Sequence, residues 1–135
     1  VPVEINRGEL QQVLINLIVN AAQAMPAGGT LTIAAHDWSD ADGTPAGVEL
    51  VVRDTGAGIA PEDLATIFDP FFTTKKESGT GLGLSVTYTI IERYGGRITV
   101  ASQPGEGAEF HLRLRRQAVF QGGPEAPGFM RRWKG

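Results

Sequence analysis

The stretch Asp54-Thr55-Gly56-Ala57-Gly58-Ile59 directly follows an alternating run, Val48 to Asp54, in which Val48, Leu50 and Val52 share one side. Alternation with a period of two predicts a strand. The glycines behind it predict a turn whose backbone can approach a flat ring closely. The carboxylate of Asp54 then stands at the strand end, where it can accept a hydrogen bond from a ligand amino group. Taken alone, this segment is also explained by a plain turn.

A helix is predicted before this strand, from Arg7 to Met25, because apolar residues recur there at three- and four-residue spacing. Pro26 and Gly28-Gly29 end it. The side chains that form a narrow polar stripe along it are Gln12, Asn16, Asn20 and Gln23. Asn16 and Asn20 are four residues apart, so their amides lie one turn apart on one face. The stripe is either a solvated helix face or a pair of amide oxygens aimed at a ligand or a hydrated Mg²⁺.

A second glycine cluster, Gly79-Thr80-Gly81-Leu82-Gly83-Leu84, opens a predicted helix from Leu84 to Tyr94. Backbone N–H groups of glycines at a helix N-terminus form a site for anions. The cluster is not a Walker A motif, because no Gly-Lys-Ser/Thr follows it, and it lacks the preceding strand of a dinucleotide-binding turn. A flexible hinge explains it equally well.

The segment Asp69 to Gly83 has no clean period and is predicted to be a mobile loop. It contains adjacent phenylalanines, Phe71 and Phe72, which are unlikely in a loop unless they pack on something. The loop is either anchored to the core or a lid, with Phe72 as its hinge anchor and Lys75 or Lys76 reaching a phosphate.

The remaining pattern completes an α/β domain. Strands are predicted at Thr30–Ala35, Arg97–Ala101 and Ala108–Leu114, a strand end at Val1–Asn6, a polar loop at Asp37–Gly47 and a short helix at Pro61–Phe68. Phe110, Leu112 and Leu114 point to one side of the last strand, while Glu109, His111 and Arg113 point to the other, which predicts a sheet with one covered and one wet face.

Composition narrows the classes of function. The chain has 135 residues, enough for one domain, and its net charge of −3 gives a nucleic-acid partner no electrostatic support. Without cysteine there is no disulfide framework and no thiolate metal site. No apolar run is long enough to span a membrane. The 18 glycines are roughly twice the usual share and gather in the clusters above.

Four segments stand in a fixed order along the chain. They are Asn16-Leu17-Ile18-Val19-Asn20-Ala21, Asp54-Thr55-Gly56-Ala57-Gly58-Ile59, Asp69-Pro70-Phe71-Phe72-Thr73-Thr74-Lys75 and Gly79-Thr80-Gly81-Leu82-Gly83-Leu84. Together they resemble the N, G1, F and G2 boxes of the ATP-binding catalytic domain (GHKL type) of two-component sensor histidine kinases. The resemblance extends roughly from Val3 to Leu114, and the Pro-Phe-Phe-Thr-Thr-Lys wording is most similar to the nitrogen-regulation type.

The resemblance implies a Bergerat fold, a two-layer α/β sandwich of a mixed β-sheet with helices on one face, over residues 1–115. By analogy Asn20 coordinates Mg²⁺, with Asn16 near the phosphates. Asp54 binds the adenine amino group, and Gly56, Gly58 and Ile59 line the base. The residues expected to meet the phosphates are Gly79, Thr80, Gly81, Leu82, Gly83 and Leu84, with Lys75 as a further contact and Phe72 in the lid. The expected cofactors are ATP and Mg²⁺.

One departure from the family pattern lies near the last predicted strand. The family often has Gly-Thr-x-Phe there, whereas this chain has Gly107-Ala108-Glu109-Phe110. Ala108 supplies no hydroxyl near the adenine, which is expected to weaken recognition of the base by about 0.5–1.5 kcal/mol.

The resemblance implies transfer of the γ-phosphoryl group to a histidine on a separate dimerisation domain, and a response-regulator receiver domain downstream. Related gyrase-type and chaperone ATPases carry a catalytic glutamate where this chain has Asn16, whose amide cannot accept a proton. His36 and His111 lack the flanking pattern of a phosphoacceptor helix and are expected to be surface residues. A nucleotide-dead docking module and an ATPase-driven clamp stay open as alternatives.

The chain starts abruptly and is expected to be a fragment of a cytoplasmic or membrane-anchored kinase, itself cytoplasmic and monomeric. No contact with nucleic acid or membrane is expected. Residues 116–135 are Gly/Pro-rich and are expected to form a C-terminal tail with no part in nucleotide binding.

Overall fold

The computed structural model describes residues 3–69 and 83–116. The helices and strands are α1 (Arg7–Ala24), β1 (Leu31–Ser39), β2 (Pro45–Asp54), α2 (Pro61–Leu64), α3 (Gly83–Arg93), β3 (Arg97–Ser102) and β4 (Ala108–Arg115). The strands form one sheet in the order β1-β2-β4-β3.

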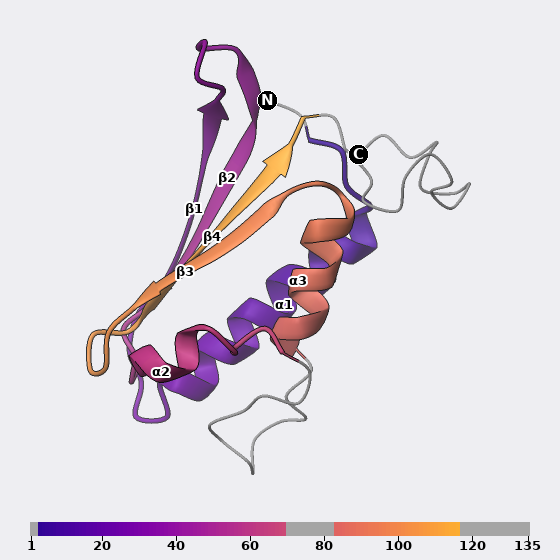
Figure 1. Cartoon of the computed structure of the whole chain (residues 1–135). Coiled ribbons are helices and arrows are strands. Elements are labelled where there is room, and N and C mark those ends of the chain that lie inside the picture. Colours follow the sequence, from indigo (N-terminus) through magenta and orange to yellow (C-terminus); the bar gives the residue numbers. More distant parts are fainter. Residues whose placement is uncertain (1–2, 70–82, 117–135) are drawn as a thin grey trace.

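The helices cover one face of this sheet, as Figure 1 shows, so the expected two-layer α/β sandwich is confirmed. All three strand pairings among the described residues are antiparallel. The sequence analysis expected a mixed sheet, but no parallel pair is found among these residues. In the register, Val52 lies opposite Phe110, and Leu50 lies opposite Leu112. The apolar side of β2 therefore continues directly into the apolar side of β4.

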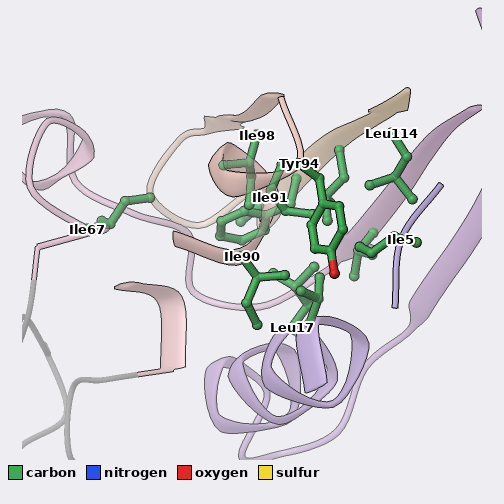
Figure 2. Close-up of a cluster of buried hydrophobic side chains, with 13 residues drawn as sticks. Ile5, Leu17, Ile67, Ile90, Ile91, Tyr94, Ile98 and Leu114 are labelled. Carbon is green, nitrogen blue, oxygen red and sulfur yellow. The ribbon is translucent and has the colours of Figure 1, made fainter. Parts of the chain in front are cut away.

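The core forms where α1 and α3 meet this apolar side (Figure 2). Leu17 of α1 and Ile91 of α3 are almost fully buried, as are Phe110 and Leu112 of β4. Burial of a side chain of this size stabilises the fold by about 1.5–3 kcal/mol. The predicted inward direction of alternate residues in β4 is confirmed, and this packing fixes both helices against the sheet.

The start of α1 is fastened to the far end of α3. Asn6 caps α1 by accepting the N–H of Glu9 at 3.1 Å, and its own N–H donates to the Tyr94 hydroxyl at 3.3 Å. That hydroxyl donates to the Glu9 carboxylate at 2.5 Å, and Arg93 donates to the same carboxylate at 3.1 Å. Burial, followed by the contact with Glu9, raises the pKa of Tyr94 to about 12. The tyrosine therefore stays protonated and keeps the two helices together.

In three segments the structure differs from the sequence prediction by more than one residue at an element boundary. The polar loop predicted at Asp37–Gly47 is wrong in extent, because β1 continues to Ser39 and β2 begins at Pro45. The added length is held across the sheet by Trp38, whose indole N–H donates to the Leu114 carbonyl at 3.3 Å while Arg113 lies over its ring. A local pattern does not contain such distant contacts.

The other two differences lie near the helices. The N-terminal segment from Val3 to Asn6 is not a strand, although Glu4 donates its N–H to the Arg115 carbonyl. The helix predicted over Pro61–Phe68 ends at Leu64 and continues as turns. Ile67, beyond the end of this helix, is buried in the core, so burial of that side chain rather than helical periodicity positions the segment.

Candidate functional site

The side chain of Asn16 links α1 to the beginning of α3. Its amide nitrogen donates to the carbonyl oxygen of Gly83 at 3.1 Å and to the hydroxyl of Thr87 at 3.3 Å. Its amide oxygen accepts from Gln12 at 2.8 Å. Thr87 is fully buried and also donates to the Gly83 carbonyl, at 2.9 Å. Asn16 thus fixes Gly83, the last glycine of the second cluster, against α1.

The opposite end of the same helix face holds the first glycine cluster. The carbonyl of Ala24, in the last turn of α1, accepts the N–H of Ala57 at 3.1 Å. A Cβ atom added to Gly56 would collide with this carbonyl, so only glycine permits the approach. Asn20 lies four residues from Asn16 and four from Ala24, which places it between the two glycine clusters on one face of the helix.

Asn20 is half-buried, and no side-chain hydrogen bond joins it to the described residues. Its amide is therefore available to a ligand, whereas that of Asn16 is fully engaged within the protein. The described residues contain no group of three or more His, Cys, Asp or Glu side chains able to hold a metal ion. This donor set fits Mg²⁺ that arrives with phosphate oxygens and water and takes one protein oxygen, rather than an all-protein metal cage.

Asp54 ends β2 and is only 4% exposed. One carboxylate oxygen, Oδ1, accepts the N–H of Gly56 at 2.8 Å, which fixes the orientation of the side chain. Among the described residues, no second donor reaches this carboxylate. The remaining oxygen, Oδ2, is free of donors from the described residues, and its predicted bond to a ligand amino group stays a prediction.

The loop after Asp54 rests on the turn between β3 and β4. The N–H of Gly105 donates to the Ala57 carbonyl at 2.7 Å. Gly58 has a φ of 78°, and a Cβ atom there would collide with the Gln103 carbonyl. The N–H of Ile59 donates to the Ser102 hydroxyl at 2.8 Å. The predicted base-lining residues Gly56, Gly58 and Ile59 are thus brought together with Asp54 in one braced loop.

The remaining predicted site residues divide into two groups. Gly83 begins α3, one residue before the predicted start at Leu84. The side chain of Leu84 packs against the core. The others, Phe72, Lys75, Gly79, Thr80, Gly81 and Leu82, lie outside the described residues. Their expected contacts with phosphate and lid stay predictions.

Two hydroxyl residues at this site were missed by the sequence analysis. Thr87 is buried in α3, where a polar residue on an apolar face is the only signal. Ser102 ends β3, and the segment from Ser102 to Gly107 was interpreted only as a linker between strands. The local pattern does not reveal that both hydroxyls hydrogen-bond to the glycine clusters.

Both histidines lie on the outer face of the sheet, away from the helices. His36 hydrogen-bonds to Glu49 at 2.9 Å, and His111 hydrogen-bonds to Glu109 at 2.6 Å. Burial acts to raise the pKa of Glu49, but hydrogen bonds from Arg113 and His111 outweigh it and lower that pKa below 4.5. The histidines therefore belong to a surface network of ion pairs and lie on the face opposite the candidate site.

None of the helices in the described residues has the length and apolar character needed to cross a membrane.

Residues 5–118 match the family described as histidine kinase-, DNA gyrase B-, and HSP90-like ATPase, and the chain belongs to this family. Within the family it is a histidine kinase catalytic domain, because its relatives are sensor kinases. Over 105 residues it is 49% identical to the sensor histidine kinase ZraS of Escherichia coli K12, and this covers 78% of the chain and 21% of ZraS. It is 40% identical to the sensor kinase CckA of Brucella abortus, and this covers 93% of the chain and 14% of CckA.

Solved structures agree with this assignment. The catalytic domain of the histidine kinase ThkA, free of nucleotide, has a TM-score of 0.71 and 36% identity, covering 85% of this chain and 71% of that one. Full-length ShkA in complex with AMPPNP has a TM-score of 0.70 and 31% identity, covering 88% of this chain and 24% of that one. The chain spans about a fifth or less of the curated relatives' length. Membership of the family supports ATP binding and a kinase role in two-component signalling.

Proposed function

We propose that this domain binds Mg-ATP and donates the γ-phosphoryl group to a histidine on a separate dimerisation and phosphoacceptor domain. The observation that carries the proposal is that Gly83, from the second glycine cluster, and the first glycine cluster both lie against α1. Asn16 in the middle of this helix bonds to Gly83, and Ala24 in its last turn bonds to Ala57. The free amide of Asn20 lies between them, where a nucleotide that contacts both clusters has to pass.

We assign the base to Asp54 and the metal to Asn20. The free carboxylate oxygen of Asp54 accepts from the adenine amino group, and Gly56, Gly58 and Ile59 lie beside the ring. Mg²⁺, when bound, neutralises phosphate charge, and the amide oxygen of Asn20 is the protein ligand we propose for it. The beginning of α3 at Gly83 presents the positive end of the helix dipole to the phosphates.

The proposal includes the residues outside the described ranges. We propose that Gly79, Thr80, Gly81 and Leu82 supply backbone N–H groups to the phosphates. Lys75 is a further phosphate contact and Phe72 an anchor of the lid over the site.

A kinase is favoured over a hydrolase by the chemistry of Asn16. Hydrolysis through a water needs a base at this helical position, but the Asn16 amide accepts no proton and is held by Gln12, Thr87 and Gly83. Phosphoryl transfer to an incoming histidine depends on positioning and charge stabilisation more than on a base from this domain. A pure docking role leaves the free amide of Asn20 and the buried carboxylate of Asp54 without a purpose.

The partners we propose follow from the position of the two histidines, neither of which lies near the site where the phosphoryl group is expected. The two histidines of the chain are tied to carboxylates on the sheet face opposite the site, so the acceptor comes from the dimerisation domain of the parent kinase. A receiver domain of a response regulator then takes the phosphoryl group. We propose that the domain ends near residue 115 and that the isolated chain is a cytoplasmic monomer without contacts to nucleic acid or membrane.

Incubation with γ-labelled ATP and Mg²⁺ tests the proposal. The chain alone is expected to bind a non-hydrolysable ATP analogue and to acquire no stable label. Addition of a dimerisation domain with its histidine is expected to give label on that domain, and its His→Ala variant none. Stable label on the chain alone contradicts the assignment of the acceptor. No binding at millimolar nucleotide favours the docking role, and rapid release of phosphate that Asn16→Ala abolishes favours the ATPase.

A further inference from the structure

We propose that Ser102 is a positioning residue for adenine recognition, because its hydroxyl fastens the loop after Asp54 to the turn between β3 and β4. This inference rests on the proposed function and adds to it a residue that the four sequence boxes do not contain.

The geometry of the hydroxyl is that of a two-way bridge. It accepts the N–H of Ile59 at 2.8 Å and donates to the carbonyl of Gly107 at 2.6 Å. Ile59 lies 43 residues earlier in the chain, in the loop that carries the base-lining residues. Ser102 therefore connects three segments, namely the end of β3, the beginning of β4 and the loop behind Asp54.

The loop has few other attachments. Among the described residues, the N–H of Gly56 donates to Asp54 Oδ1, at the start of the loop. The loop backbone is otherwise held by two bonds of Ala57, which donates to the Ala24 carbonyl and accepts from Gly105. Both of those bonds are between backbone groups and precede Gly58. Ser102 is thus the side chain that fixes the Ile59 end of the loop, the part expected to lie against the adenine ring.

The position of Ser102 on the sheet also favours a role toward the base. Ser102 pairs with Ala108 across β3 and β4, and both lie on the side of the sheet that carries Ile98 and Phe110. This is the side that the helices cover. The hydroxyl of Ser102 therefore lies opposite Ala108, which has no hydroxyl group.

Both hydrogen-bond partners of the Ser102 hydroxyl are shielded from water, so they depend on this hydroxyl for their hydrogen bonds. Gly107 is buried and Ile59 is half-buried, so removal of the hydroxyl leaves an N–H donor and a C=O acceptor without their partner. Threonine keeps the hydroxyl and suits a strand end, whereas alanine removes it. The pair Ser102→Ala and Ser102→Thr therefore separates the hydroxyl from the bulk of the side chain. Thr99→Ala is the matched control, since it removes an exposed hydroxyl from the same strand.

Two measurements on the full chain test the inference. The first is amide hydrogen exchange without nucleotide, in which Ser102→Ala is expected to speed exchange at Ile59 while Thr99→Ala does not. The second is the affinity for ATP and for inosine triphosphate, which lacks the adenine amino group. Ser102→Ala is expected to weaken ATP binding about tenfold, the effect of roughly one net hydrogen bond, and to reduce the preference for ATP over inosine triphosphate. Ser102→Thr is expected to restore both.

The outcomes separate the inference from the function on which it rests. Unchanged exchange at Ile59 in Ser102→Ala overturns the anchoring. Equal weakening of ATP, inosine triphosphate and inorganic tripolyphosphate shows general destabilisation and overturns the role in adenine recognition. A wild-type chain that binds no ATP refutes the proposed function and the adenine role with it, while exchange at Ile59 still decides the anchoring.

Discussion

Asn16 and Gly83, 67 residues apart in the chain, are joined by a hydrogen bond of 3.1 Å from a side-chain amide to a backbone carbonyl. This bond brings the beginning of α3 to the middle of α1 and so determines where the second glycine cluster ends. It also distinguishes the two asparagines. The side chain of Asn16 is hydrogen-bonded within the protein, whereas that of Asn20, one turn further, has no hydrogen bond to the described residues and is the one we propose for the metal.

Asn16→Ala is expected to weaken both the fold and the site. The variant loses the bonds to Gly83 and Thr87, so the free energy of unfolding is expected to fall by about 1–2 kcal/mol in urea titrations. ATP affinity is expected to fall as well, because Gly83 is no longer held beside Asn20. Gln12→Ala is the control, since Gln12 is exposed and touches the same amide. A variant with wild-type stability and wild-type affinity contradicts the linking role.

Asn20→Ala is expected to affect metal-dependent binding alone. Since the side chain of Asn20 has no hydrogen bond to the described residues, its truncation is expected to change the free energy of unfolding by less than about 0.5 kcal/mol. Calorimetric titration is expected to show weaker ATP binding in Mg²⁺ and unchanged binding in EDTA. Equal weakening under both conditions argues against a role as the metal ligand.

Asp54→Asn is expected to reduce ATP affinity about tenfold to a hundredfold, because a charged acceptor for the adenine amino group is replaced by an amide. Asparagine retains an oxygen for the N–H of Gly56, so the fold is expected to persist in circular dichroism. Glu62→Gln is a suitable control, as it neutralises an exposed carboxylate in α2. Wild-type ATP affinity in Asp54→Asn refutes the assignment of the base site.

The stability of the domain is expected to fall in acid partly through Glu49. Hydrogen bonds from Arg113 and His111 hold the folded-state pKa of Glu49 below 4.5 against the effect of burial. A lowered folded-state pKa gives a contribution that is present above pH 4.5 and is lost as the pH falls through the folded value. Thermal unfolding between pH 3 and 7 is expected to show a shallower acid decline for Glu49→Gln. An unaltered pH profile in Glu49→Gln contradicts a contribution of Glu49 to the acid decline.

Removal of residues 117–135 is expected to leave nucleotide affinity nearly unchanged. The described fold ends with β4 at Arg115, and the residues that converge on α1 all precede it. Titration of the shortened chain with an ATP analogue measures this directly. A large loss of affinity shows that the tail belongs to the site, and the proposed domain boundary is then wrong.

Local patterns predicted most of the fold, because the amphipathic spacing of α1 and α3 and the alternation of β2 and β4 record burial on one side. Gly95-Gly96 was correctly predicted to end α3, where the N–H of Gly96 donates to the Ile91 carbonyl. The full length of β1 was not predictable, since it depends on Trp38 meeting Arg113 and Leu114 across the sheet. Such contacts join residues that are more than 70 positions apart.

The connections within the candidate site could not be predicted from the sequence, and the ligand-binding roles of its residues stay predictions. Asp54 and Asn20 stand out by type and spacing, and the structure leaves an acceptor on each without a donor among the described residues. The engagement of Asn16 by Gly83, and of Ile59 by Ser102, depends on long-range geometry. Hydroxyl groups that bridge two backbone segments leave no periodic signature in a sequence.

The contact of Tyr94 with Glu9 and Asn6 attaches the C-terminal end of α3 to the start of α1. One end of this helix is clamped to the segment through which the chain reaches α1, and its other end carries Gly83. The contact with Asn6 and Glu9 and the proposed phosphate site therefore lie at opposite ends of one helix of eleven residues.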